Sequence, residues 1–523
     1  MIILISYEKL TTNNSFLKQN TSDAPIPDAV RNWLQSFHRA FSNNNSYELA
    51  SAYESFSRLT DKHYQKSPWP SSETIAPLVN NDSNFLMFYR ELYFRHVYAK
   101  LSPSLEDRFA SYENYCDIFN FVLNSDGPVE LDLPNQWAWD IVDEFVFQFQ
   151  NYYSNRTRLV RRSQNTSNFD PNVLEDITMI KENQHVWSCY SVLNVLYSLI
   201  QKSNIKQILA ANKAGTDTQS IVGEYGAVNL YRMLGYFSII GLLRVHCLLG
   251  DFTLALMMLD DIELNKKAMF ARVTSAHYQT YYYVGFAYMM LHRYADAIKA
   301  LNHILPILSR SKHDSRTSQY DQVTKKGDQM CVLLAICLSL SPSRVDDQLH
   351  SLLREKYSEQ QTKMARGGKE ALATYEELFT FAAPKFINAV SGDFDTKLGS
   401  MEPVQFHLKI FLNDVTRWST IQTLKSYLKL YSTMDIKKLA AFLGMETEDL
   451  RKALILYKER TRQFRWSEGD LLTGDLVNTS DVDFGLAEDI IHIAESRTGR
   501  KYGDWFLRNT IKYFGMQEAM DKQ

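Results

Sequence analysis

Two helical blocks repeat at a spacing of 42 residues, and this repetition constrains the fold more than any other feature of the chain. The blocks span residues 243–262 and 285–304. A small residue recurs where two helices must approach closely, and an aromatic residue recurs at the start of the second helix of each hairpin. The matching pairs are Leu249 and Leu291, Phe252 and Tyr294, Ala255 and Ala297, Leu259 and Leu301, and Ile262 and Ile304. Stacked hairpins of this kind predict a TPR-like helical-repeat solenoid.

The hydrophobic period changes between Met434 and Ile493, which predicts a different module after the repeats. Two short helices are expected first, joined at Gly444, because glycine adopts the positive φ of a helix C-cap. Their apolar stripes are Ile436, Leu439, Ala440 and Phe442 on the first helix, and Leu450, Ala453, Leu454 and Tyr457 on the second, which opens at Glu446 or Thr447. Short strands at 464–466 and 490–493 follow. Helix, turn, helix and hairpin together predict a winged helix.

Composition supports a mainly α fold. The chain has 523 residues, 45% of them apolar, with only 20 glycines and 13 prolines. Its net charge of −3 means that any RNA contact should be a local patch, because free nucleic-acid binders are usually basic. Five scattered cysteines indicate reduced thiols, and the first residues do not resemble a signal peptide. We therefore expect a cytoplasmic protein that does not contact a membrane.

The pattern divides the chain into six segments. Residues 1–24 are expected to be a mobile tail, 25–154 an N-terminal helical domain and 155–184 a basic linker. Residues 185–431 carry the repeats, 432–498 the winged helix and 499–523 a terminal helix. In the linker, the arginines at 156, 158, 161 and 162 have no acidic neighbours in sequence. We expect a solvated loop there, with contact to phosphate or to an acidic partner as the alternative.

No pattern of catalytic residues stands out. The Asp483-Phe484-Gly485 tripeptide matches a kinase motif, but the glycine-rich loop and the catalytic loop of a kinase are missing. The stretch 367–370 lacks the Ser or Thr of a phosphate-binding loop. Cys331 and Cys337 have no second pair with which to bind zinc. We therefore expect no enzyme activity, no cofactor and no metal.

One charge cluster suggests a function. Residues 451–465 contain six basic side chains and one acidic side chain, Glu459. Winged helices contact phosphates through such cations, so the candidate RNA contacts are Lys437, Lys438, Arg451, Lys452, Lys458 and Arg462. A solvated outer face is an equally good interpretation, and wings that bind only other proteins are a further alternative.

A helical solenoid followed by a winged helix and a terminal helix resembles the PCI-domain family. Its members build the proteasome lid, the COP9 signalosome and translation initiation factor 3. The stretches GEYGAVNLYRMLGYFSIIGLLRVHCLLGDF (223–252), TYYYVGFAYMMLHRYADAI (280–298), TMDIKKLAAFLGM (433–445) and DIIHIAESRTGRKYGDWFLR (489–508) resemble the initiation factor 3 branch. The resemblance runs from about Pro25 to the C-terminal end and is looser near the start.

This resemblance implies a scaffold subunit that helps to assemble the small ribosomal subunit with initiator tRNA and mRNA. The implied partners are other initiation factor 3 subunits, especially the small PCI subunit K, and the small ribosomal subunit. We expect the wing strands, including the strand at 490–493, to add edge to edge to a partner wing, and the terminal helix to join a helical bundle. The expected contacts are Ile490, Ile491, Ile493, Trp505, Phe506 and Phe514. A subunit of the proteasome lid or the signalosome is the alternative.

Overall fold

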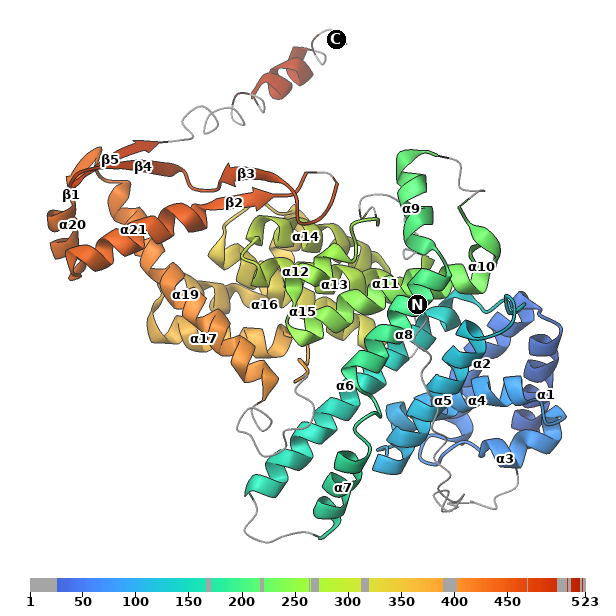
Figure 1. Ribbon diagram of the computed structural model, residues 1–523. Coiled ribbons are helices and arrows are strands. Elements are labelled where there is room, and N and C mark those ends of the chain that lie inside the picture. Colours follow the sequence, from blue (N-terminus) through green and yellow to red (C-terminus); the bar gives the residue numbers. More distant parts are fainter. Residues whose placement is uncertain are drawn as a thin grey trace. The chain divides into compact units, whose positions relative to one another are not determined.

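The computed structural model describes residues 26–165, 171–216, 221–262, 264, 272–311, 319–388, 402–467, 469–495, 506, 509–517 and 520. The chain forms two compact units, which we describe separately (Figure 1). The first comprises residues 1–251, 261–280 and 385–403. The second comprises residues 252–260, 281–384 and 404–523.

The first unit is built from helices. They are α1 (Asp28–Ser42), α2 (Ser46–His63), α3 (Ser72–Ile75), η1 (Ala76–Val79), α4 (Ser83–Lys100), α5 (Leu105–Leu123), α6 (Asn135–Asn165), α7 (Pro171–Glu182), α8 (Cys189–Lys202), α9 (Ile205–Ala214), α10 (Gly223–Ala227) and α11 (Asn229–Leu249). Side-chain caps fix several helix starts; the Asp82 carboxylate, for example, accepts from the backbone of Asn84 at 3.0 Å.

Aromatic side chains fill the core of this unit. Trp137 on α6 is fully buried and stacks on Phe37 of α1 at 5.5 Å and on Tyr53 of α2 at 5.2 Å between ring centroids. Phe88 of α4 meets it edge-on at 5.8 Å. Such offset and edge-on pairs are the favoured aromatic geometries. Phe88 of α4 and Trp137 of α6 therefore serve core packing.

A polar network lies beside this core. Glu91 of α4 is buried and accepts a hydrogen bond from the Trp137 indole at 3.1 Å, and it pairs with Arg95 one turn later. Arg95 also reaches Asp140 on α6, at 3.5 Å. One guanidinium thus faces several carboxylates. Burial, opposed by Arg95, raises the pKa of Asp140 to about 6 and that of Glu144 to about 8.

Helix α11 lies at the centre of this unit. Among the described residues it is the one helix long and apolar enough to cross a membrane, yet 89% of its apolar window is buried inside the protein. Gly235 and Gly241 allow close packing here. A Cβ on Gly235 would lie 2.0 Å from the Ser203 hydroxyl, and one on Gly241 would lie 3.0 Å from a Val142 methyl. The burial and these close approaches identify α11 as a core helix.

The predicted loop of 155–184 is wrong, because α6 continues to Asn165 and α7 follows at Pro171. Leu159 and Val160 are buried and extend the apolar stripe of α6. Arg161 pairs with Glu402 at 3.3 Å. Arg162 lies in the last turn of α6, where a cation complements the helix dipole. The arginine charges suggested a loop, although the apolar stripe of α6 continues through this segment.

In the residues that the structure describes, the second unit combines helices with five short strands. Its helices are α12 (Phe252–Met257), α13 (Thr274–Met290, which begins in the first unit), α14 (Tyr294–Ser311), α15 (Gln319–Leu340), α16 (Asp347–Arg366), α17 (Gly368–Ala382), α19 (Pro403–Leu428), α20 (Ile436–Leu443) and α21 (Thr447–Thr461). Its strands are β1 (Thr433–Asp435), β2 (Arg462–Arg465), β3 (Asp475–Asn478), β4 (Val482–Ala487) and β5 (Ile490–Glu495). The expected class, mainly α with helical repeats and a winged helix, is confirmed.

The backbone conformation at the helix ends also repeats after 42 residues. Helix α11 ends at Gly250, with φ of 85°, and α13 ends before His292, with φ of 60°. In both turns the next residue donates a backbone hydrogen bond to the carbonyl five positions earlier: Asp251 to His246 at 3.0 Å and Arg293 to Tyr288 at 2.9 Å. Equivalent positions of the two blocks are therefore capped in the same way. Ala255 and Ala297 are both fully buried, as the spacing predicts.

The raised pKa of Glu144 predicts a pH-dependent stability. The pKa of Glu144 in the folded chain lies above its ordinary value near 4.5. Between these two pKa values the folded chain binds more protons than the unfolded chain, so the free energy of unfolding falls as pH rises from about 5 to about 8. Besides burial, the neighbouring carboxylates also raise the pKa of Glu144, namely those of Asp143, Glu91 and Asp140, whereas Arg95 lowers it. Glu144→Gln should raise the free energy of unfolding at pH 8 by on the order of 1 kcal/mol and flatten the profile.

Denaturant unfolding of the full chain at pH 5, 6.5 and 8 measures this effect. Glu130→Gln, at an exposed glutamate of the same unit, is the matched control. Equal pH slopes for wild type and Glu144→Gln would contradict the assignment.

Candidate protein–protein interface

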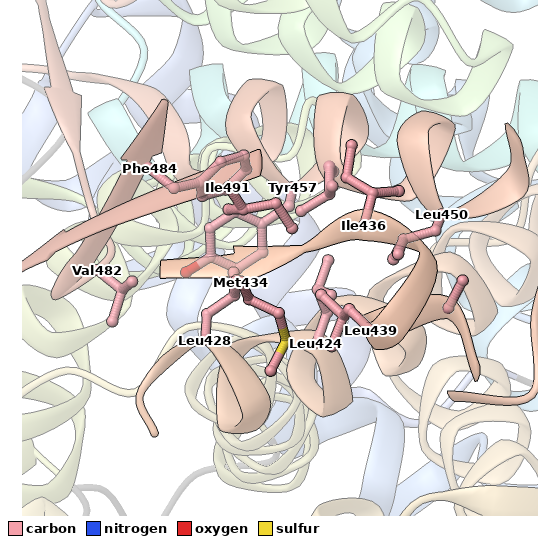
Figure 2. Packing of buried hydrophobic residues seen from close by; sticks show 12 residues of the cluster. Leu424, Leu428, Met434, Ile436, Leu439, Leu450, Tyr457, Val482, Phe484 and Ile491 are labelled. Carbon is pink, nitrogen blue, oxygen red and sulfur yellow. The ribbon is translucent and has the colours of Figure 1, made fainter. Parts of the chain in front are cut away.

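The winged helix has its own apolar core. Figure 2 shows Met434 of β1 pointing toward Leu424 and Leu428 of α19. The full set of buried residues is Leu424, Leu428, Met434, Ile436, Leu439, Ala440, Leu450, Leu454, Tyr457, Val482, Phe484 and Ile491. The predicted stripes of α20 and α21 are confirmed, except that Phe442 is 48% exposed. Phe484, the middle residue of the kinase-like tripeptide, is a core residue of β4.

The helix ends follow local chemistry. Asp435 caps α20 by accepting from the backbone N–H of Lys437 at 2.7 Å. Gly444 closes α20 with φ of 65°, as predicted. Glu446 is the N-cap of α21, and Glu448 and Asp449 lie in its first turn, where acids favour the helix dipole.

The main sheet has the order β1-β5-β4, with all strands antiparallel. Strand β5 is therefore internal, so the prediction that residues 490–493 form a free edge is wrong. Its second neighbour, β1, is only three residues long and gives almost no sequence signal. The free edge beside the wing turn belongs to β4, within the part of the chain that the structure describes.

A second hairpin, β2–β3, is inserted between α21 and β4. The strand predicted at 464–466 exists, but it pairs with Asp475–Asn478 in a separate two-stranded sheet and not with β5 (Figure 1). Gly474 is required where the hairpin turns back. With φ of 152°, a Cβ there would lie 2.6 Å from the Arg465 carbonyl oxygen.

The loop of this hairpin is fixed to α13 and α14 by buried polar groups. The guanidinium of Arg293 donates to the carbonyls of Leu472 at 2.8 Å and Thr473 at 3.1 Å. It also pairs with Asp296 at 2.7 Å, and both side chains are buried. Asp296 in turn accepts from the Trp466 backbone N–H at 2.9 Å. Burial raises the pKa of Asp296, while Arg293 opposes the shift.

Two further contacts complete this anchor. The Tyr288 hydroxyl donates to the Leu471 carbonyl at 2.8 Å. Lys299 donates to the Trp466 carbonyl at 3.2 Å and lies 4.4 Å from the centroid of the Trp466 ring. Sequence reasoning missed this cluster, although an Arg and an Asp three residues apart in the second repeat were a visible signal.

Most of the predicted RNA-contacting cations have acidic partners. Lys437 and Arg451 both reach Asp489 in the β4–β5 turn, the former at 3.9 Å. Lys452 pairs with Asp449 at 3.1 Å. Lys458 lies 3.7 Å from Asp483 and donates to the Phe484 carbonyl at 2.7 Å. Arg460 pairs with Asp414 of α19 at 2.9 Å. Within the described ranges, no ion pair holds Lys438, Arg462 or Arg465.

The outward face of α21 is mixed in charge. Its exposed residues at helical spacing are Glu448, Lys452, Ile455 and Glu459. Two acids, one base and an isoleucine do not make the cationic surface that a nucleic-acid-reading helix presents. The RNA hypothesis remains a prediction, with fewer free cations than the sequence suggested.

The expected partner-binding residues fall into three groups. Ile491 is fully buried in the core and Ile493 packs against it, so these two hold the wing together. Ile490 is 46% exposed. Phe506 and Phe514 are 61% and 64% exposed, and residues 509–517 are helical. Trp505 lies outside the described residues.

Ile490 and the terminal segment therefore offer apolar surface to a partner. The further exposed apolar residues of that segment are Ile511, Tyr513, Met516 and Met520. No group of three or more His, Cys, Asp or Glu side chains is arranged to hold a metal ion in the described parts of the chain.

The Arg293–Asp296 anchor predicts a specific mutational effect. Arg293→Ala should leave the carbonyls of Leu472 and Thr473 without their donors, at a cost of about 1–3 kcal/mol for each unsatisfied group. Amide exchange should then accelerate across residues 462–478 and stay unchanged in α21. Hydrogen–deuterium exchange of the full chain measures this, with Arg344→Ala, an exposed arginine of the same unit, as control. Unchanged exchange in the hairpin would refute the anchoring role.

Comparisons with known proteins agree with this architecture. The sequence model of the family described as "RNA polymerase I-associated factor PAF67" matches residues 107–513. Eukaryotic translation initiation factor 3 subunit L of Mycosarcoma maydis is 51% identical over 93% of this chain and 73% of that protein. Subunit L of Yarrowia lipolytica is 50% identical over 94% of this chain and 89% of the relative.

Subunit L of Neurospora crassa is 55% identical over 79% of this chain and 86% of the relative. Identity at this level over most of both chains confirms the initiation factor branch of the resemblance. The chain belongs to the family of eukaryotic translation initiation factor 3 subunit L.

Proposed function

We propose that this chain is a non-enzymatic scaffold subunit of translation initiation factor 3, acting in the cytoplasm. The observation that carries the proposal is its identity of 50% or more, over most of its length, to proteins named as subunit L of that factor. The finer role is to help bring initiator tRNA and mRNA to the small ribosomal subunit. The partners are other subunits of the factor, especially the small PCI subunit K, and the small ribosomal subunit.

The terminal segment is the main joint in this proposal. Exposed Phe506 and Phe514 belong to a segment that carries further exposed apolar residues at 511, 513, 516 and 520. Exposed apolar side chains concentrated in one segment mark a protein–protein contact, because they are costly to leave in water. A helical bundle with partner helices would bury them. The outer edge of β4 near Leu486, next to the half-exposed Ile490, offers a short stretch of backbone for strand addition, whereas at Phe484 the outward N–H already donates to Asp483 and the carbonyl accepts from Lys458.

A double substitution tests the joint. Phe506→Asp with Phe514→Asp in the full chain should abolish co-purification of other initiation factor 3 subunits and leave the melting temperature unchanged, because both side chains are exposed. Tyr190→Asp, at an 87% exposed aromatic of the first unit, is the control and should co-purify normally.

The amounts of co-purifying subunits are measured by quantitative mass spectrometry of the purified complexes. Sedimentation beside small ribosomal subunits is measured in parallel. Undiminished co-purification of the double variant would remove the terminal segment from the proposal. Recovery of the wild-type chain with proteasome, signalosome or RNA polymerase I subunits in place of initiation factor subunits would overturn the proposal itself.

Direct RNA binding is the second candidate, supported by exposed Lys438, Arg462 and Arg465, which have no ion pair among the described residues. Contact through these three cations would give a slope of log affinity against log salt no steeper than about −2, since each neutralised phosphate of a single strand contributes about −0.7. Titration of the full chain with single-stranded RNA at several salt concentrations measures it. A steeper slope, unchanged by Lys438→Ala with Arg462→Ala, would place the RNA contact elsewhere.

A further inference from the structure

The inserted β2–β3 hairpin exposes an apolar pair. Thr479 donates to the Thr461 carbonyl at 2.7 Å, so the alternation of an antiparallel ladder makes 464 and 476 a non-hydrogen-bonded pair. In such pairs the Cα atoms are about 4.5 Å apart and the side chains meet closely. Phe464 is 51% exposed and Leu476 is 58% exposed. Two large apolar side chains thus share one face of the hairpin and lie open to solvent.

A single cation borders this pair. Arg462 lies two residues before Phe464 and therefore on the same face, and its cross-strand neighbour is the neutral Asn478. Its side chain is exposed and has no ion pair within the described part of the chain. Arg465 belongs to the opposite face, directly across from Asp475. The exposed face therefore carries one net positive charge beside an apolar centre.

The backbone under this face is held rigidly. An isolated two-stranded hairpin is marginally stable in water. Here the loop between the strands is fixed by Arg293, Asp296 and Lys299, and Gln463 on the inner face is buried. A surface already fixed before binding loses little conformational entropy when a partner docks. The anchor thus suits a docking surface.

We propose that the face formed by Arg462, Phe464 and Leu476 binds an apolar protein segment of another chain in the assembly, with an acidic side chain of that segment set against Arg462. The partner segment should contact the apolar centre with aliphatic or aromatic side chains, and it should contact the single arginine with one carboxylate. A nucleic acid fits less well, because one cation and an aliphatic leucine provide neither a phosphate track nor a second stacking platform. The surface is additional to the terminal segment and the β4 edge.

This inference rests on the proposed function in one respect: the partner is expected to be a chain that co-purifies with this protein. The test places the photo-cross-linker p-benzoylphenylalanine at position 464, and separately at 476, in the full-length tagged chain in cells. After irradiation, purification and peptide sequencing, both positions should join the same apolar peptide of another chain, with an Asp or Glu within a few residues of the joined site. The same cross-linker at Phe381, which is 47% exposed in the same unit, is the control.

A charge reversal then tests the role of Arg462. Arg462→Glu should lower the cross-link yield at 464 about tenfold, which corresponds to about 1.4 kcal/mol, whereas Arg462→Lys should largely preserve it. Replacing the carboxylate of the partner by lysine should restore the yield with Arg462→Glu. These exposed substitutions leave the buried anchor untouched, so a lost cross-link does not report misfolding.

Four outcomes would overturn the inference. They are cross-links to nucleic acid, to a second copy of this chain, to another segment of the same chain, or a yield no higher than at Phe381. Failure of the scaffold proposal is recognised separately, because co-purifying subunits are identified before irradiation and the cross-linked peptide is sequenced whatever they are.

Discussion

The exposed hairpin of the winged region depends on a buried ion pair between Arg293, directly before α14, and Asp296 of α14. Arg293 uses its donors on one carboxylate and two loop carbonyls, and Asp296 accepts from the Trp466 backbone as well as from Arg293. A buried ion pair stabilises a fold only when its remaining hydrogen-bonding capacity is satisfied, and here loop carbonyls and a backbone N–H provide that satisfaction. The pair therefore fixes the course of residues 466–473 and, through them, the hairpin.

Most of the cations in this region form ion pairs within the chain. The sequence count between 451 and 465 suggested an excess of cations, but their acidic partners come from other segments. Asp489 in the β4–β5 turn, Asp483 on β4 and Asp414 on α19 each meet one or more of them. Each exposed pair contributes little by itself. Their joint effect is to leave fewer cations without an ion pair than the sequence count suggested and to tie α21 to the wing.

Features with a local signal could be predicted from sequence. The stripes of α20 and α21 and the Gly444 cap depend on residues within one or two turns of each other, and the 42-residue repeat is visible because one such local pattern occurs twice. Features set by distant partners could not. The strand Asp475–Asn478 has no alternating pattern, and its pairing with β2 depends on an anchor supplied by α13 and α14.

The residues of the candidate interface also divide into those with a signal in the sequence and those whose position is set by distant parts of the chain. Phe506 and Phe514 were expected as partner contacts from the resemblance and are exposed, whereas Ile491 is buried because β5 is the central strand. That position depends on β1, a strand of three residues that no periodicity can reveal. The helical state of residues 155–165 was hidden for a different reason. The arginines dominated the composition there, although Leu159 and Val160 continue the stripe of α6.

The exposure of Phe464 and Leu476 has no explanation in the stability of this chain alone. Full burial of such a side chain stabilises a fold by about 1.5–3 kcal/mol, and both lie on a hairpin whose backbone is already fixed. A rigid anchor under an uncovered apolar pair is therefore best understood as a surface that a partner covers.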